Sequence, residues 1–210
     1  LDPELLGKVF ENLLASYNPD TRSTARKQSG SFYTPREVVD YMVDEALIAY
    51  FARHLPNGEQ REQDLRQLLS HADTEHAFGE AEADVLVLAI EQLKVLDPAC
   101  GSGTFLFHSI RSYLAAAAAA GIPVPDRLRG VTRSVLGMDL HPVAVTLARV
   151  TYILAIGREL LTHAERGILF IPVYLGDSVQ WSDQSTNLWN AGSLVIPVDD
   201  DVELLASALR

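Results

Sequence analysis

The sequence predicts an α/β fold in which a partial parallel sheet is flanked by helices and preceded by a helical extension. Residues 94–177 repeat the pattern strand, turn, helix, and this alternation is typical of parallel sheets whose faces are covered by helices. Residues 1–53 carry apolar side chains at helical spacing in two stretches. With 210 residues, 48% of them hydrophobic, the chain can form one full-sized core and a helical appendage.

The N-terminal segment, 1–53, is predicted to form two helices joined by a polar loop. The first helix covers 1–17 and the loop covers 18–31. Thr34-Pro35-Arg36-Glu37 has the pattern of a capping box with Pro at the first helical position, and it opens a helix through about Ala52. The buried side of this helix is expected to hold Val38, Val39, Met42, Val43, Ala46 and Leu47.

Residues 54–93 are predicted to be a helical insertion or linker. Charged and histidine side chains dominate 54–82, and a helix over Ala83–Gln92 leads into the first strand of the sheet. His71 and His76 suggest a metal site, but their spacing of five does not place them on one helical face. A solvated insertion is the better interpretation.

The sheet core is predicted to cover residues 94–210. Its strands and helices alternate in the order Val95–Leu96, Thr104–Ala120, Ser134–Met138, Pro142–Ile156 and Leu169–Leu175. Residues 187–201 predict a strand or hairpin, and Val202–Leu209 predicts a helix, without a role that the sequence indicates. The apolar side of this last segment is a candidate surface for homodimer formation.

Charge and cysteine content restrict the function. Seventeen basic against 28 acidic residues give a formal net charge of −11, whereas a surface that binds a nucleic-acid backbone by itself usually has a basic excess. The single cysteine excludes an internal disulfide framework and a zinc site with several thiolates. The sequence has no signal-peptide pattern and no apolar run of membrane-spanning length, so the default expectation is a cytoplasmic location without a membrane partner. The chain opens at Leu1 without an initiator Met, and we expect it to be a piece of a longer protein.

The most specific signal is the string Asp97-Pro98-Ala99-Cys100-Gly101-Ser102-Gly103-Thr104-Phe105, between a predicted strand and a predicted helix. Glycines in such a turn let the backbone approach a ligand without Cβ atoms in the way, and the following helix offers free N–H groups. A lone Gly-x-Gly would be weak evidence, because many glycines only serve tight turns. The string lacks the further glycine of the dinucleotide fingerprint and the Lys of a Walker A loop, which excludes the latter.

This string resembles motif I of amino-group DNA methyltransferases. Upstream, Gly30-Ser31-Phe32-Tyr33-Thr34-Pro35 resembles motif X of the γ-type N6-adenine enzymes of bacterial restriction–modification systems, including fused restriction–methylation proteins. The resemblance implies a Rossmann-like class I methyltransferase fold with S-adenosyl-L-methionine as cofactor, and it places Thr34 near the cofactor's carboxylate. It assigns the cofactor contacts of these two motifs to Tyr33, Thr34, Asp97, Ala99, Gly101, Gly103, Thr104 and Phe105.

Two further strand ends provide carboxylates. Asp139 follows the second strand, where a carboxylate can accept hydrogen bonds from both ribose hydroxyls of a nucleoside. The resemblance assigns Asp139 this role, with Leu140 or His141 beside the adenine, and a helix cap is the alternative. Asp177 and Ser178 follow the third strand and resemble motif III, in which the Asp accepts a hydrogen bond from the adenine amino group; a plain Gly-Asp turn is the alternative.

The residues for methyl transfer itself are not found in the sequence. The resemblance implies an Asn/Asp/Ser-Pro-Pro-aromatic motif that holds the flipped adenine, yet no Pro-Pro dipeptide occurs. We therefore predict no catalytic residue here: the core stops before that motif, and the chain binds cofactor without methylating. Double-stranded DNA is then contacted by other parts of the parent protein. Cys100, within the cofactor loop, is expected to be a packing residue.

Two alternatives stay open. One is an enzyme of the same fold that acts on RNA or on protein glutamine, and motif X at the N-terminal side favours the DNA enzymes over it. The other is a non-catalytic scaffold domain. A scaffold has no physical need for the five residues Asp97, Gly101, Gly103, Asp139 and Asp177 together.

Overall fold

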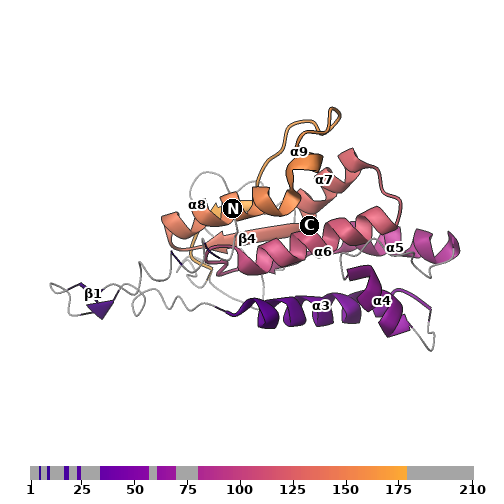
Figure 1. The fold of residues 1–210 in the computed structure, drawn as a ribbon, viewed down its shortest axis with the longest axis horizontal. Helices are drawn as coiled ribbons and strands as arrows, with labels where there is room; N and C mark the ends of the chain where they lie inside the picture. Colours follow the sequence, from indigo (N-terminus) through magenta and orange to yellow (C-terminus); the bar gives the residue numbers. More distant parts are fainter. Residues whose placement is uncertain are drawn as a thin grey trace, which may run out of the picture.

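A computed structural model of the chain describes residues 5, 9, 17–18, 23–24, 34–56, 61–69 and 80–178. Within these residues a small parallel sheet is combined with helices (Figure 1). The elements in chain order are β1 (Tyr17–Asn18), β2 (Ser23–Thr24), α3 (Arg36–Ala52), α4 (Arg61–Leu69), α5 (Glu80–Gln92), β3 (Val95–Asp97), α6 (Thr104–Ala119), α7 (Val124–Ser134), β4 (Val135–Asp139), α8 (Pro142–Ile156), α9 (Arg158–Leu161) and β5 (Val173–Leu175).

Strands β3, β4 and β5 pair in chain order and in parallel. Val95 pairs with Val135, and Gly137 pairs with Val173. Because parallel neighbours need a crossover connection, α6 and α7 link β3 to β4, and α8 and α9 link β4 to β5. The predicted α/β class with a small parallel sheet is thus confirmed.

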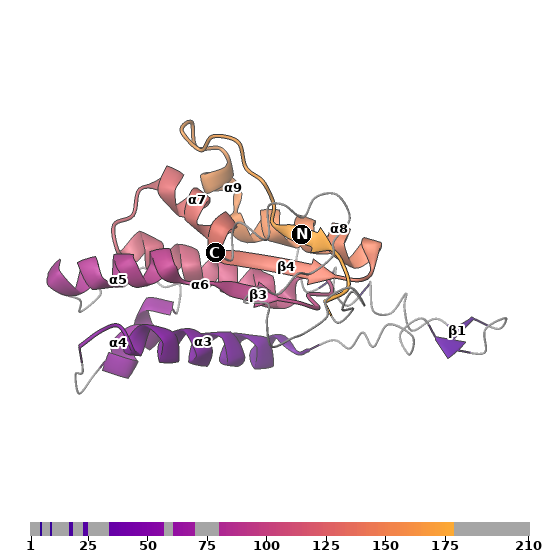
Figure 2. The same cartoon turned by 180° about the vertical axis from the view of Figure 1, so that it is seen from behind.

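The helices α8, α6 and α3 lie side by side, with α3 on the β3 side of the sheet (Figures 1 and 2). Alternation along each strand sends side chains to two faces. Val95, Val135 and Val173 join the main core with these helices, whereas Leu136 and Met138 form a separate small cluster with Tyr174.

The main core is centred on α6. Ala116 and Ala117 of its alanine run are fully buried, so their small side chains let neighbouring elements approach the helix closely. Leu65 and Leu68 of α4 are also almost fully buried in this core. Part of the predicted insertion 54–93 therefore packs into the core and is not exposed to solvent.

Two predictions about α3 are wrong. The helix begins at Arg36, and Pro35 takes the N-cap position with an extended backbone and without a side-chain cap hydrogen bond, so Thr34 does not form a capping box. The expected buried side is also rotated, because the residues facing the core follow a spacing of four. The buried residues are Val39, Val43, Leu47, Ile48 and Phe51. Expected in the core but exposed are Val38, Met42 and Ala46.

Other elements differ in extent. Helix α7 was not expected, because Pro123, Pro125 and Gly130 are loop signals, yet Leu128 and Val131 anchor it in the core. Strand β5 is shorter than predicted, and the predicted loop 18–31 includes part of the short antiparallel pair β1–β2. None of the described helices combines the length and the apolar composition that crossing a bilayer requires.

Several expectations fall on residues that the structure does not describe. Of the predicted helix 1–17, Leu5, Val9 and Tyr17 are described. Leu5 and Val9 are helical, whereas Tyr17 lies in β1, so the predicted end of this helix is wrong. Tyr33, the two histidines His71 and His76, and the segment from 179 onward lie outside the described residues.

Candidate functional site

The three strand tips meet at one edge of the sheet. Asp97 ends β3 and pairs with Gly137, two residues before the end of β4 at Asp139. Asp139 pairs with Leu175, which ends β5, and its carbonyl accepts a hydrogen bond from the Gly176 N–H at 3.0 Å. The turn after β3, the acid after β4 and the Gly-Asp sequence after β5 are thereby brought to the same edge, as the parallel topology requires.

The turn Pro98–Gly103 is held by backbone hydrogen bonds and by two glycines with positive φ. The Cys100 N–H donates to the Met138 carbonyl at 2.9 Å, and the Gly103 N–H donates to the Cys100 carbonyl at 2.8 Å. Gly101 has φ 54° and Gly103 has φ 88°, a region that glycine adopts without a steric penalty. This explains why the turn needs glycine at both positions.

The two glycines have different surroundings. A Cβ added at Gly103 would lie 3.1 Å from Ala148 Cα, so this glycine allows α6 to begin directly against α8. A Cβ added at Gly101 would meet no heavy atom within 4 Å. Gly101 therefore presents bare backbone to open space, where a ligand can approach it.

Asp139 connects this turn to the end of β4. Its Oδ2 accepts a hydrogen bond from the Gly101 N–H and its Oδ1 accepts one from the His141 N–H, both at 2.8 Å. His141, rather than Asp139, caps α8, since its Nδ1 accepts from the Val143 N–H at 3.2 Å. Each Asp139 oxygen keeps a second lone pair for another donor.

Asp97 lies close enough to Asp139 for their charges to interact. Burial raises the pKa of the Asp97 carboxyl above its ordinary value, the Ala99 N–H that donates to Oδ1 at 3.3 Å lowers it, and the charge of Asp139 raises it further. The site therefore concentrates negative charge in a partly desolvated place, which favours a positively charged ligand.

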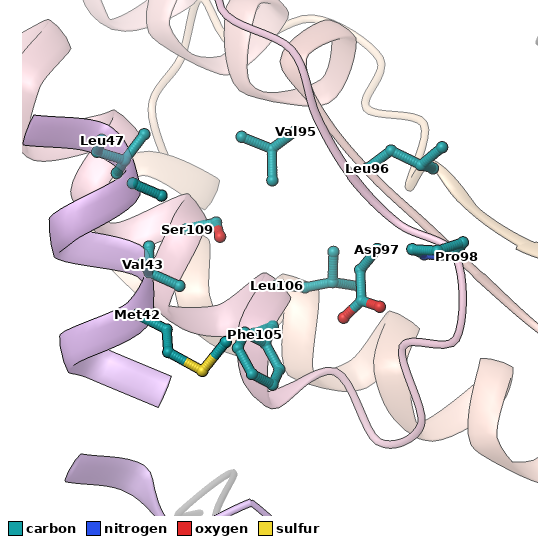
Figure 3. Close-up of a pocket in the computed structure, with 11 residues that line it drawn as sticks. Met42, Val43, Leu47, Val95, Leu96, Asp97, Pro98, Phe105, Leu106 and Ser109 are labelled. Carbon is teal, nitrogen blue, oxygen red and sulfur yellow. The ribbon is translucent and has the colours of Figure 1, made fainter. Parts of the chain in front are cut away.

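A pocket of about 320 Å³ lies beside Asp97, between α3, β3 and α6 (Figure 3). Figure 3 shows the Asp97 carboxylate extending from the strand side toward the pocket, with Met42 and Phe105 on the walls formed by α3 and α6. Among the described residues that line this pocket, Asp97 is the only one with a charged side chain. The lining residues are Met42, Val43, Ala46, Leu47, Val95, Leu96, Asp97, Pro98, Phe105, Leu106 and Ser109.

The part that α3 plays in this pocket was missed in the sequence, although Met42 and Ala46 were recognised as apolar positions of a helix. Helical spacing identifies an apolar side but does not say whether that side faces a filled core or an open pocket. The exposure of Met42 and Ala46 is explained by their position on the pocket wall.

The remaining predicted site residues are distributed around this edge. Thr34 is half-buried just before α3, Thr104 is half-buried at the start of α6, and Ala99 is exposed in the turn. Leu140 is 67% exposed next to Asp139, and Asp177 and Ser178 follow β5, half-buried and exposed respectively. The structure thus brings Gly101 into contact with Asp139, and Asp97 and Phe105 into one pocket.

Cys100 is buried within the turn. Burial, together with the charges of Asp97 and Asp139, raises the pKa of its thiol to about 12. A thiol with this pKa stays protonated near neutral pH and is a poor nucleophile. Cys100 is therefore a packing residue, as its place in the sequence indicated.

Comparison with known proteins gives two relatives, and no family model matches the chain. A predicted type II restriction enzyme and methyltransferase of Methanocaldococcus jannaschii is 23% identical over 205 residues, which cover 88% of this chain and 17% of the relative. The adenine-specific methyltransferase PglX of Streptomyces coelicolor is 34% identical over 118 residues, which cover 53% of this chain and 9% of the relative. The chain thus spans less than a fifth of the length of either relative. By sequence, the chain is similar to a segment of a type II restriction enzyme and methyltransferase and to a segment of an adenine-specific methyltransferase.

Proposed function

We propose that the chain is the S-adenosyl-L-methionine-binding part of an N6-adenine DNA methyltransferase, within a restriction–modification or phage-defence protein. The hydrogen bond from the Gly101 N–H to Asp139 Oδ2, at 2.8 Å, is the main support. It joins the glycine turn after one strand to the carboxylate at the end of the next. A nucleoside lying across both strand tips meets bare backbone on one side and a carboxylate on the other, as in Rossmann-like sheets.

The described residues fit a cationic nucleoside. Gly101 faces open space, Asp97 and Asp139 supply negative charge, and Asp97 also lines an apolar pocket. S-adenosyl-L-methionine carries positive sulfonium and ammonium groups, which complement the two carboxylates. When bound, it supplies a methyl group that the sulfonium activates for transfer.

Each residue then has a definite binding role. Asp139 accepts hydrogen bonds from the ribose hydroxyls through its two remaining lone pairs, while the Gly101 and His141 N–H groups fix its orientation. Asp97 balances the positive charge of the methionine end, and Phe105 excludes water beside it. Thr34 and Asp177 keep the roles that the resemblance implies, near the cofactor carboxylate and the adenine amino group.

DNA binding and methyl transfer belong, in this proposal, to other parts of a longer protein. The net charge of −11 is unfavourable for binding a phosphate backbone, and the sequence has no Pro-Pro dipeptide for a motif that holds the target adenine. The relatives are several times longer than this chain. Their names favour adenine methylation over the RNA and glutamine alternatives.

Calorimetric titration with S-adenosylhomocysteine tests the proposal. We expect the wild-type chain to bind, and Asp139→Ala to bind at least about tenfold more weakly, since two charge-assisted hydrogen bonds to the ligand are lost. Asp126→Ala is the matched control, because Asp126 is an exposed carboxylate on α7, away from the strand tips. Unchanged affinity in Asp139→Ala, or no binding by the wild-type chain, would contradict the proposal.

A further inference from the structure

A histidine on α6 lies between two carboxylates of α3. His108 Nδ1 is 2.9 Å from Asp40 Oδ1, and His108 Nε2 is 2.9 Å from Asp44 Oδ1. The His108 side chain is only 11% exposed, and the two carboxylates are about one-third exposed. The spacing of four between the acids puts them one turn apart on the same face of α3, so they bracket the imidazole ring.

The two carboxylates determine which hydrogen bonds His108 can make. A carboxylate only accepts hydrogen bonds, so a ring nitrogen of His108 that bonds to Asp40 or Asp44 does so as the donor. Asp40 also faces Arg36, whose Nε is 3.6 Å from Asp40 Oδ2. Charge-assisted hydrogen bonds of a nearly buried group are stronger than exposed ion pairs, so this histidine ties α3 firmly to α6.

The contacts of His108 with Asp40 and Asp44 lie next to the pocket. On α3, Val43 and Leu47 line the pocket, and each follows one of the two acids by three residues, which places it on the same side of the helix. On α6, Phe105 and Ser109 line the pocket on either side of His108 in sequence. The distance between α3 and α6 at the pocket is therefore controlled by the nearby contact of His108 with α3.

We propose that His108, held by Asp40 and Asp44, is a positioning residue that fixes the width of this pocket and thereby the affinity for S-adenosyl ligands. The inference rests on the proposed function for its ligand. His108 acts through α3, because it fixes the position of this helix and with it Val43 and Leu47, which line the pocket. In sequence it resembles any polar helix residue.

The test compares His108→Gln with Arg66→Gln. Arg66 ties the same helix α3 to α4 through Glu45, with Nη1 to Oε1 at 2.6 Å, but none of these residues lines the pocket. We measure S-adenosylhomocysteine affinity by calorimetry, the Tm of each variant, and hydrogen exchange of the amides 36–44 without ligand. His108→Gln should bind about tenfold more weakly or worse and exchange faster over 36–44, whereas Arg66→Gln should keep its affinity within about twofold.

Asp44→Asn gives a second variant should His108→Gln fail to fold, because Asp44 is more exposed and the amide keeps its size; it should move both readouts in the same direction. Wild-type affinity in the folded variants, or an equal loss in Arg66→Gln, would overturn the inference. If the wild-type chain binds no S-adenosyl ligand, the proposed function fails instead. In that case, faster exchange over 36–44 in His108→Gln but not in Arg66→Gln still supports the inference that His108 fixes the position of α3. Equal exchange in the two variants overturns that inference.

Discussion

At the scale of single residues, the binding role proposed for Asp97 works against the stability of the fold. Asp97 is a carboxyl placed where burial and a neighbouring charge both raise its pKa. Because the folded state then holds the proton more tightly than the unfolded chain does, the ionised carboxylate destabilises the ligand-free fold. A cationic ligand would relieve this cost, which is typical of residues kept for binding.

Asp97→Asn should therefore raise the stability of the ligand-free chain near neutral pH. The destabilisation by Asp97 is absent below its ordinary pKa of 3.8, develops as the pH rises through the ordinary and the raised values, and is complete above them. We expect the Tm of Asp97→Asn to exceed that of the wild type at about pH 7 and the difference to shrink toward about pH 3. Asp84→Asn, on the exposed side of α5, is the control. A lower Tm at neutral pH in Asp97→Asn would show that its carboxylate stabilises the fold.

At the scale of elements, sequence patterns located the strands and the helices that face the core. They failed where the end of an element, or the side that it buries, depends on the elements packed against it. Helix α8 was predicted to the residue, because Pro142 and Gly157 mark its ends. The buried face of α3 was not, because which of its apolar residues meet α6 depends on how the two helices dock. The turn and the acids of the site could be predicted, since their residue types are specific, whereas the pocket wall on α3 could not.

The start of α6 against α8 can be tested at Gly103. Gly103→Ala should lower the free energy of unfolding by about 2–4 kcal/mol, because it combines a left-handed backbone with a contact of 3.1 Å to Ala148 Cα. Gly121→Ala, which follows α6, shares a positive φ of 74° but meets nothing within 4 Å, so it should cost only about 1–2 kcal/mol. Urea unfolding of both variants measures the difference. Equal losses would mean that helix packing does not require glycine at position 103.

At the scale of the whole molecule, the chain combines the sheet edge proposed to bind the ligand with an acidic overall charge. The relatives place such a segment within much longer proteins, and a charge of −11 repels nucleic acid. The division into 1–53, 54–93 and 94–210 remains a prediction, although Phe51 of α3 and Leu65 of α4 belong to the same core as α6. The described helical segments thus stabilise the sheet domain.

We expect the chain by itself neither to retard a short DNA duplex at low salt nor to transfer a radiolabelled methyl group to it. Electrostatic repulsion opposes the encounter, and the sequence lacks a Pro-Pro-aromatic motif to hold the adenine. Gel retardation and a filter-binding methylation assay measure the two activities, with an active adenine-specific DNA methyltransferase as positive control. Methyl incorporation by the chain alone would contradict the proposal that it binds the cofactor without methylating DNA.

We propose above all that a positively charged nucleoside binds where β3 and β4 end. Amide NMR of the chain titrated with S-adenosyl-L-methionine measures this binding residue by residue, because the N–H groups of Gly101 and His141 donate to the carboxylate that should receive the ribose. We expect these two amides, and that of Asp177, to shift the most and to saturate together. Shifts confined to residues away from the strand tips, or none at saturating ligand, would contradict it.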